Sequence, residues 1–256
     1  MNPMVISWIV FGCVFGAAML GMVLRSVVPE HHLSADSKDV VKLGMGLIAT
    51  MSALVLALLI ASAKGSHDTQ NGEVIQMSAD FIQLDRVLAH YGPETREARA
   101  MLRDVIARGF GVETGSNNYR PESLDTAAVK AGANNFYEKI QQLTPVNETQ
   151  RALHSQAMEL GAELGRTRAL LLEQTGGSIP MPFLIVMIFW FTMIFLTFGL
   201  FAPSNTTVVS VLLVCSLSVA GAIFLILELD RPFEGLIQIS EAPMRDALSR
   251  LQQQAP

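Results

Sequence analysis

The segment 227–235, which follows the last long apolar stretch, has charged side chains at Glu228, Asp230, Arg231 and Glu234. Carboxylates at the edge of a membrane are costly unless they are paired or hydrated. A helix that continues to Arg231 would pair this side chain with Glu228, three residues before it, and would aim Asp230 elsewhere. A helix that stops at Asp230, because Pro232 disfavours helix in the residue before it, would open the geometry for a cation. The segment is therefore either a structural boundary or an ion site.

Two further groups of side chains, three phenylalanines and two histidines, could form a channel constriction or a metal site. Phe191, Phe195 and Phe198 share one helical face, which suits either a hydrophobic constriction of a channel or packing against lipid and other helices. His31 and His32 are adjacent, so a helix does not aim both at one ion, and a polar turn explains them as well. The sequence has no phosphate loop, serine-hydrolase motif or zinc-protease motif. We therefore expect no enzyme, no catalytic residue, no metal and no cofactor.

The elements that must position these side chains are four apolar stretches of about 20 residues, enough for a helix to cross a hydrocarbon core of roughly 30 Å. None of them contains Asp, Glu, Lys, Arg or His, and they are residues 4–24, 43–63, 183–202 and 208–227. A buried core helix of that length would normally show a polar face. The sequence therefore predicts an all-α membrane protein with four spans.

The first stretch is predicted to be a permanent span, because no positive charge precedes Val5 and its apolar run is longer than the 7 to 15 residues, roughly, of a signal peptide. Cys13 and Cys215 both lie inside spans, so no disulfide framework is expected. The net charge of -5 argues against nucleic acid as a partner. The glycosylation sequons at Asn147 and Asn205 are interpreted as chance matches, the first in a helix and the second too close to the membrane.

Four spans place both termini and the long middle segment on one side of the membrane. Basic residues near the spans favour the cytoplasm for that side by five to three, with Lys64, Arg166, Arg168, Arg231 and Arg245 against Arg25, Lys38 and Lys42. We therefore predict a multi-pass membrane protein with its middle segment and both termini in the cytoplasm. Its parts are a first transmembrane hairpin (1–63), a soluble helical domain (64–180), a second hairpin (181–227), and the acidic boundary with an amphipathic C-terminal helix (228–256).

The middle domain reads as a helical bundle. We predict a helix that continues from the second span to His90 and ends at Gly92, helices over 94–108 and 122–143 with a loop over 109–121 between them, and a fourth helix from Thr144 to Gly176. Apolar residues recur at steps of three and four on the first and fourth helices, at Val74, Met77, Phe81, Leu84 and Leu88 and at Leu153, Ala157, Leu160, Leu164 and Leu171. Antiparallel pairing of these two helices as a stalk would bury both rows.

The C-terminal helix carries its own apolar row at Met244, Ala247, Leu248 and Leu251. In the spans, small residues recur at steps of four, at Gly12 and Gly16, with Ala17 and Gly21 offset by five, and at Ala53, Ala57 and Ala61. Small side chains let helix backbones approach closely in lipid, either within one subunit or between subunits.

Three stretches, residues 53–64, 84–94 and 227–237, resemble a bacterial family of bestrophin-like membrane proteins. Bestrophins are pentameric anion channels with four spans, cytosolic termini and a helical cytosolic region between the second and third spans, so the resemblance implies the same plan here. Bestrophin pores have an aromatic neck in the second span, and residues 43–63 contain no aromatic residue. The acidic calcium clasp that follows the fourth bestrophin span is matched loosely by Glu228, Asp230 and Glu234.

Two functions follow as hypotheses. The first is a homo-oligomeric, bestrophin-like anion channel or transport protein in the lipid bilayer. The second is a non-conducting membrane anchor whose cytoplasmic helices bind a protein partner, since no span contains a charged residue. The hydroxyl side chains of residues 49–62 are Thr50, Ser52 and Ser62, which are few for an aqueous pore and sufficient for a hydrophobic gate.

Overall fold

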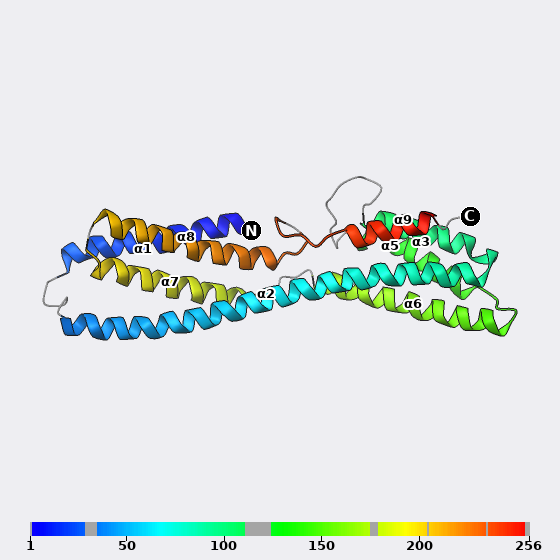
Figure 1. Cartoon of the computed structure of the whole chain (residues 1–256), viewed down its shortest axis with the longest axis horizontal. Coiled ribbons are helices and arrows are strands. Elements are labelled where there is room, and N and C mark those ends of the chain that lie inside the picture. The colour runs from blue at the N-terminus through cyan, green and yellow to red at the C-terminus, as the bar shows by residue number, and fades with distance from the viewer. Residues whose placement is uncertain are drawn as a thin grey trace. The chain divides into compact units, whose positions relative to one another are not determined.

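The computed structural model describes residues 2–28, 35–110, 124–174, 179–203, 205–233 and 235–253. The elements in these ranges are helices (Figure 1), namely α1 (Pro3–Val27), α2 (Ala35–Tyr91), the short 3-10 helix η2 (Pro93–Thr95), α3 (Arg96–Phe110), α5 (Ala127–Gln141), α6 (Glu148–Glu173), α7 (Met181–Phe201), α8 (Thr206–Leu229) and α9 (Ala242–Gln253). The predicted all-α class is confirmed. The chain divides into two units, unit 1 with Met1–Ser66 and Gly177–Asp230, and unit 2 with His67–Gly176 and Arg231–Pro256.

Unit 1 contains the apolar helices. Helices α1, α7 and α8 and the first part of α2 are long and apolar enough to cross a membrane, which confirms the four predicted spans. Helix α1 packs along both α7 and α8, and α2 joins them through Leu59 and Ala63, which contact Met187 and Ile226. The packing does not confirm two separate hairpins, because α1 contacts the helices of the other predicted hairpin.

Glycines bring the backbones of α1 and α7 into contact. A Cβ atom added to Gly21 would overlap the main-chain oxygen of Leu196, and one added to Gly199 would overlap that of Ala18. Gly12 and Gly16 lie on the exposed side of α1, where an added Cβ would meet nothing within 4 Å. The close approach within the chain therefore depends on Gly21 and Gly199, and the row of Gly12 and Gly16 takes no part in it.

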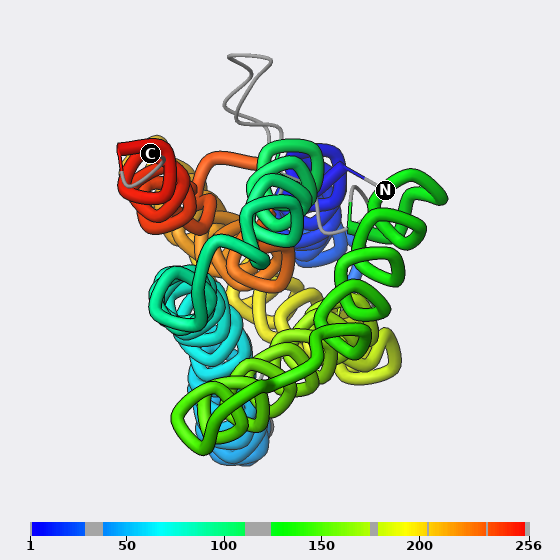
Figure 2. The backbone as a smooth tube through the Cα atoms, turned by 90° about the vertical axis from the view of Figure 1, so that its right-hand side faces the viewer, coloured from blue at the N-terminus to red at the C-terminus, as the bar shows by residue number. Residues whose placement is uncertain are grey.

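In unit 2, α2 and α6 run antiparallel, as the two apolar rows predicted. At one end the Gln174 side-chain amide donates to Glu73 Oε1 at 3.0 Å. At the other end the Gln150 side-chain amide donates to the Tyr91 carbonyl at 3.0 Å. Between them the core collects apolar side chains of both rows, including Val74, Met77, Phe81, Leu84, Leu88, Ala157, Leu164 and Leu171. Helix α3 lies between α5 and α9 (Figure 2). The predicted apolar row of α9, Met244, Ala247, Leu248 and Leu251, is buried.

Some predicted helix ends are wrong. Helix α6 begins at Glu148, after Thr144 and Pro145, because Asn147 is its N-cap and accepts a hydrogen bond from the Gln150 amide at 2.7 Å. Asn147 therefore precedes the helix, contrary to the interpretation of its sequon as helical. Helix α3 includes Gly109 and Phe110, which the sequence assigned to a loop. Helix α5 begins at Ala127 with Thr126 as its cap, and the predicted helix start at residue 122 lies outside the described residues.

The predicted fourth helix was extended too far along the chain: α6 ends at Glu173, and Gly176 lies outside the described residues. His31 and His32 also lie outside them. Asn205, the other sequon residue, is the N-cap of α8 and accepts from the Val208 amide at 2.9 Å. Each sequon asparagine therefore has a capping role that explains it without glycosylation.

Gly92 ends α2 as predicted, with φ 140° and ψ -179°, a conformation that other residues rarely adopt. The next turn is fixed by the Thr95 hydroxyl, which donates to the Leu88 carbonyl at 2.6 Å. We expect Gly92→Ala to lower the free energy of unfolding by about 1–3 kcal/mol, the usual cost of such backbone strain. Chemical denaturation of the protein in detergent, followed by circular dichroism, measures it.

The control for this prediction is Gly72→Ala, inside α2. An added Cβ at Gly72 meets nothing within 4 Å, so we expect this variant to be stabilised by up to about 1 kcal/mol through helix propensity. Equal destabilisation of both variants would show that the conformation of Gly92 is not what limits this turn.

Candidate functional site

The acidic segment after the fourth span adopts the second of its two predicted geometries. Helix α8 ends at Leu229, and Asp230 is its C-cap, with its amide donating to the Ile226 carbonyl at 3.1 Å. Glu228 is 3% exposed in unit 1, and Arg231 is exposed at the start of the second segment of unit 2. Glu234 lies outside the described residues. Within the described ranges no three His, Cys, Asp or Glu side chains form a metal site, so an ion site here stays a prediction.

The residues that follow attach this segment to unit 2. Phe233 and Ile239 are buried in the core of that unit, and the Ile239 amide donates to the Pro232 carbonyl at 2.7 Å. Gly235 has φ 95°, which permits the bend between them. These contacts place the residues after Arg231 in the core of unit 2, and the interpretation of the segment as a structural motif at the membrane boundary stays a prediction.

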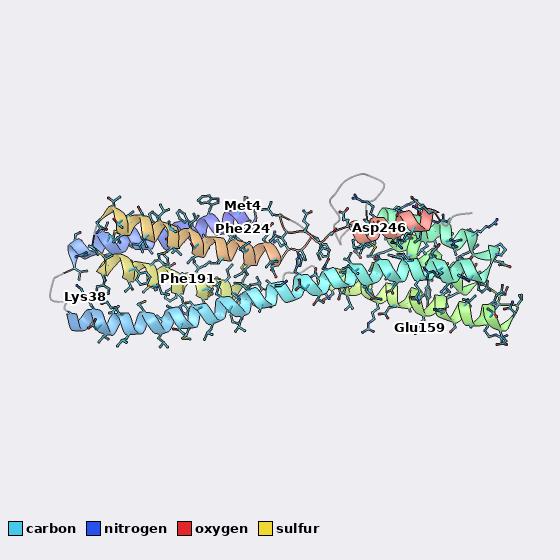
Figure 3. The ribbon with its side chains drawn as sticks, viewed as in Figure 1. Met4, Lys38, Glu159, Phe191, Phe224 and Asp246 are labelled. Carbon is cyan, nitrogen blue, oxygen red and sulfur yellow. The ribbon has the colours of Figure 1, made fainter. Side chains whose placement is uncertain are left out.

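The three phenylalanines of the predicted constriction have different surroundings in α7. Phe191, labelled on α7 in Figure 3, packs against the cluster of Leu59 and Ala63 and also against the cluster that contains Phe195. Phe195 is 4% exposed and packs with α1 and α8, whereas Phe198 is 50% exposed. The rings of Phe195 and Phe198 are 6.0 Å apart at 60°. Packing between helices thus accounts for Phe191 and Phe195, and a constriction formed by all three stays a prediction.

The membrane part of α2 has the least covered surface of the four spans. Buried residues make up 11% of its most apolar stretch, against 28% in each of α1, α7 and α8. The covered face includes Ser52, whose hydroxyl donates to the Ile48 carbonyl at 2.8 Å. Thr50 and Ser62 are exposed, and the Thr50 hydroxyl donates to the Gly46 carbonyl at 2.8 Å. The exposed face therefore offers two of the three predicted hydroxyls, one of them bonded to its own helix.

The exposed surface of α2 has three parts at 3.6 residues per turn. Directly opposite the covered face lies a central row, Leu43, Thr50, Leu54 and Ala61. On one side of it lies a flank of mostly small residues, Ala49, Ala53 and Ala57, which also includes the exposed Ile60. On the other side lies a flank of mostly large residues, Leu47, Met51 and Leu58, which also includes Gly44 and Ser62. One helix thus presents shallow and protruding surfaces on opposite sides of an uncovered row.

A buried ion pair in unit 2 was missed by the sequence analysis. Arg99 of α3 donates from Nε to Asp85 Oδ1 at 2.8 Å and from Nη2 to Oδ2 at 2.7 Å, and the two side chains are 7% and 1% exposed. These hydrogen bonds raise the pKa of the Arg99 guanidinium above its usual range. The signal in the sequence was an aspartate beside Leu84 in the apolar row of α2. The pair joins α3 to α2.

A second buried carboxylate, Asp80, lies on the same helix. Burial raises the pKa of its carboxyl; a hydrogen bond from Gln76 at 2.9 Å opposes this shift, and the negative charge of Glu163 adds to it. Among the described residues its Oδ2 atom has no hydrogen-bond partner. A single carboxylate with one amide partner does not form a metal or catalytic site.

The comparisons with known proteins agree with this architecture. The family model of the Bestrophin-like domain matches residues 12–244. No curated protein matches the chain. Among solved structures, the crystal structure of a bacterial bestrophin homologue from Klebsiella pneumoniae, which carries a point mutation, aligns with a TM-score of 0.62 and 12% identity over 96% of this chain and 97% of that one. At this identity the likeness concerns the fold, whereas the domain model covers nearly the whole sequence: the chain belongs to the Bestrophin-like family.

Proposed function

We propose that the protein is a homo-oligomeric anion channel of the bacterial inner membrane, in which copies of α2 surround the pore. The known members of the Bestrophin-like family are ion channels, which supports a channel function for this chain. The observation that carries the proposal is the uncovered surface of α2, the span with the fewest buried residues. Unit 2 and both termini are assigned to the cytoplasm from the balance of basic residues near the spans.

The three parts of the exposed surface suit a ring of copies. In a cyclic assembly each subunit meets its neighbours through two different surfaces. The small flank (Ala49, Ala53 and Ala57) would receive the large flank (Leu47, Met51 and Leu58) of the next copy, because small residues let helices approach closely in lipid. The central row would then point to the symmetry axis. Its leucines form a pore wall that opens and closes by wetting and dewetting.

The alternative function is a non-conducting anchor whose unit 2 binds a protein partner in the cytoplasm. The absence of charged side chains from all four apolar stretches favours it, since charged rings commonly line ion pathways. On this alternative the exposed surface of α2 contacts lipid, and no regular oligomer is needed.

Cysteine accessibility tests the assignment of the pore. In a background with Cys13→Ser and Cys215→Ser, we expect Leu54→Cys protein in liposomes to lose most of its chloride flux when a water-soluble thiol reagent is added. Native mass spectrometry in detergent should show one homo-oligomer. The matched control is Val214→Cys on α8, an exposed apolar position on another span, whose flux should not respond.

Two results would contradict the proposal. A monodisperse monomer with no flux above that of empty vesicles would favour the anchor. Flux that responds equally at residues 54 and 214 would remove α2 from the pore wall while leaving a channel in place.

A further inference from the structure

Unit 2 contains a cavity of about 260 Å³ between α2, α3, α5 and α6, which opens to solvent beside the exposed Asn134 and Gly165. Its wall is mostly aromatic and aliphatic, with Met77, Phe81, Leu102, Phe110, Phe136 and Leu164. An apolar cavity of about 150 Å³ is large enough to bind benzene, so by the same ratio this one holds about ten non-hydrogen atoms. The space is therefore suited to a small molecule and too small for a peptide or a helix.

Two glycines of α6 border this space and leave it unfilled. Gly161, Leu164, Gly165 and Arg168 line the cavity from one face of the helix. A Cβ added to Gly165 would meet nothing within 4 Å, and one added to Gly161 would make an ordinary contact of 3.5 Å with the Tyr137 ring. Glycine in a helix is about 1 kcal/mol less favourable than alanine. Unlike Gly21 and Gly199, these glycines do not permit a close helix crossing, and their effect is to keep the cavity open.

Arg168 gives the cavity a positive charge. Its Nε donates to the Leu124 carbonyl at 3.1 Å, and its Nη2 donates to the same oxygen. Within the described part of the chain, this guanidinium forms no ion pair with a carboxylate. A guanidinium has five N–H donors, so several remain for a ligand, and a carboxylate is the group that accepts two of them in parallel.

We propose that this cavity binds a small amphipathic anion, with its apolar tail among the phenylalanines and its carboxylate on Arg168. Octanoate, a carboxylate of about ten non-hydrogen atoms, matches both the volume and the charge. A neutral apolar molecule would leave the guanidinium unused. The site lies wholly within unit 2, so the proposal does not depend on whether α2 lines a pore.

Equilibrium dialysis of radiolabelled octanoate against the protein in detergent, with detergent alone as the blank, tests the site. We expect saturable binding that approaches one octanoate per chain. Gly165→Phe fills the space and should weaken this binding at least tenfold. Gly72→Phe is the matched control, because Gly72 also has open space around an added Cβ and does not line the cavity. Unchanged binding in Gly165→Phe, or no saturable binding above the blank, overturns the proposal.

A second variant tests the charge. Arg168→Met keeps an apolar wall of similar length, so we expect it to lose octanoate binding and to keep the binding of octanol. Melting temperatures of both variants identify any that fail to fold. Loss of octanol and octanoate to the same extent in folded Arg168→Met protein overturns the role of the guanidinium.

Discussion

Gly199→Ala is expected to separate α1 from α7 and to lower the free energy of unfolding by about 3 kcal/mol or more, the upper end of the cost of overpacking. The added Cβ would overlap the main-chain oxygen of Ala18, which belongs to a helix backbone and has no rotamer with which to move away. In lipid, helices associate through close packing more than through hydrophobicity, so a lost backbone contact has no ready substitute. Gly21→Ala should behave alike, since its Cβ would overlap the oxygen of Leu196.

The melting temperature of the protein in a mild detergent measures this effect. Gly12→Ala and Gly16→Ala are matched controls on α1, where an added Cβ meets nothing within 4 Å, and we expect changes within about 0.5 kcal/mol. If Gly199→Ala and Gly12→Ala melt at the same temperature, the crossing of α1 and α7 is looser than the structure shows. Should Gly12→Ala or Gly16→Ala instead dissociate an oligomer while leaving the monomer folded, these glycines belong to an interface between copies.

The spans could be predicted because each apolar stretch lacks charge over a length that fits the bilayer. The same uniformity hides which face of a span packs against its neighbours. Leu58 and Leu59 are neighbours in an apolar helix, yet the first is 69% exposed and the second is 7% exposed. Their residue type is the same, so the uncovered surface of α2, on which the proposed pore depends, required the structure.

Close contacts between segments that are distant in the sequence could not be predicted either. The small residues noted in the first span include Gly21 beside Gly12 and Gly16, but the sequence does not connect Gly21 with Gly199, which lies 178 residues away and forms the other half of the close crossing. At α6, the pair Thr144 and Pro145 has the types of a helix start, but Asn147 makes the capping hydrogen bond. In the acidic segment, proline disfavours helix in the residue before it, so Pro232 made a helix end at Asp230 one of the two predicted geometries. The structure has this geometry, with Asp230 as the C-cap of α8.

The stretch 84–94, one of the three that resemble the family, contains one half of the buried ion pair and the turn at Gly92. The structure gives these residues a role in joining α2 to α3, and none of them belongs to the exposed surface of α2 in the membrane. These contacts give the resemblance in this stretch a structural explanation.

Arg99→Met is accordingly expected to lower the free energy of unfolding by about 3–5 kcal/mol, because it leaves the buried Asp85 carboxylate without its charged partner. The double variant Asp85→Leu/Arg99→Met should recover most of this loss, since apolar side chains of similar volume often replace a buried pair at little cost. Denaturant titration of Asp85→Leu, Arg99→Met and the double variant gives the coupling energy between Asp85 and Arg99. The matched control is Arg108→Met, which removes an exposed pair with Asp104 at 2.8 Å in the same helix and should cost below about 1 kcal/mol.

Equal losses in Arg99→Met and Arg108→Met would show that the Asp85–Arg99 pair is solvated in the working protein. The double variant also separates folding from conduction, because it removes both charges while retaining the packing of α3 on α2. We expect its chloride flux per folded oligomer in liposomes to equal that of the unmodified protein. A folded double variant without flux would instead connect the stretch 84–94 to the pore, and the ion pair would then act on the membrane part of α2 through the same continuous helix.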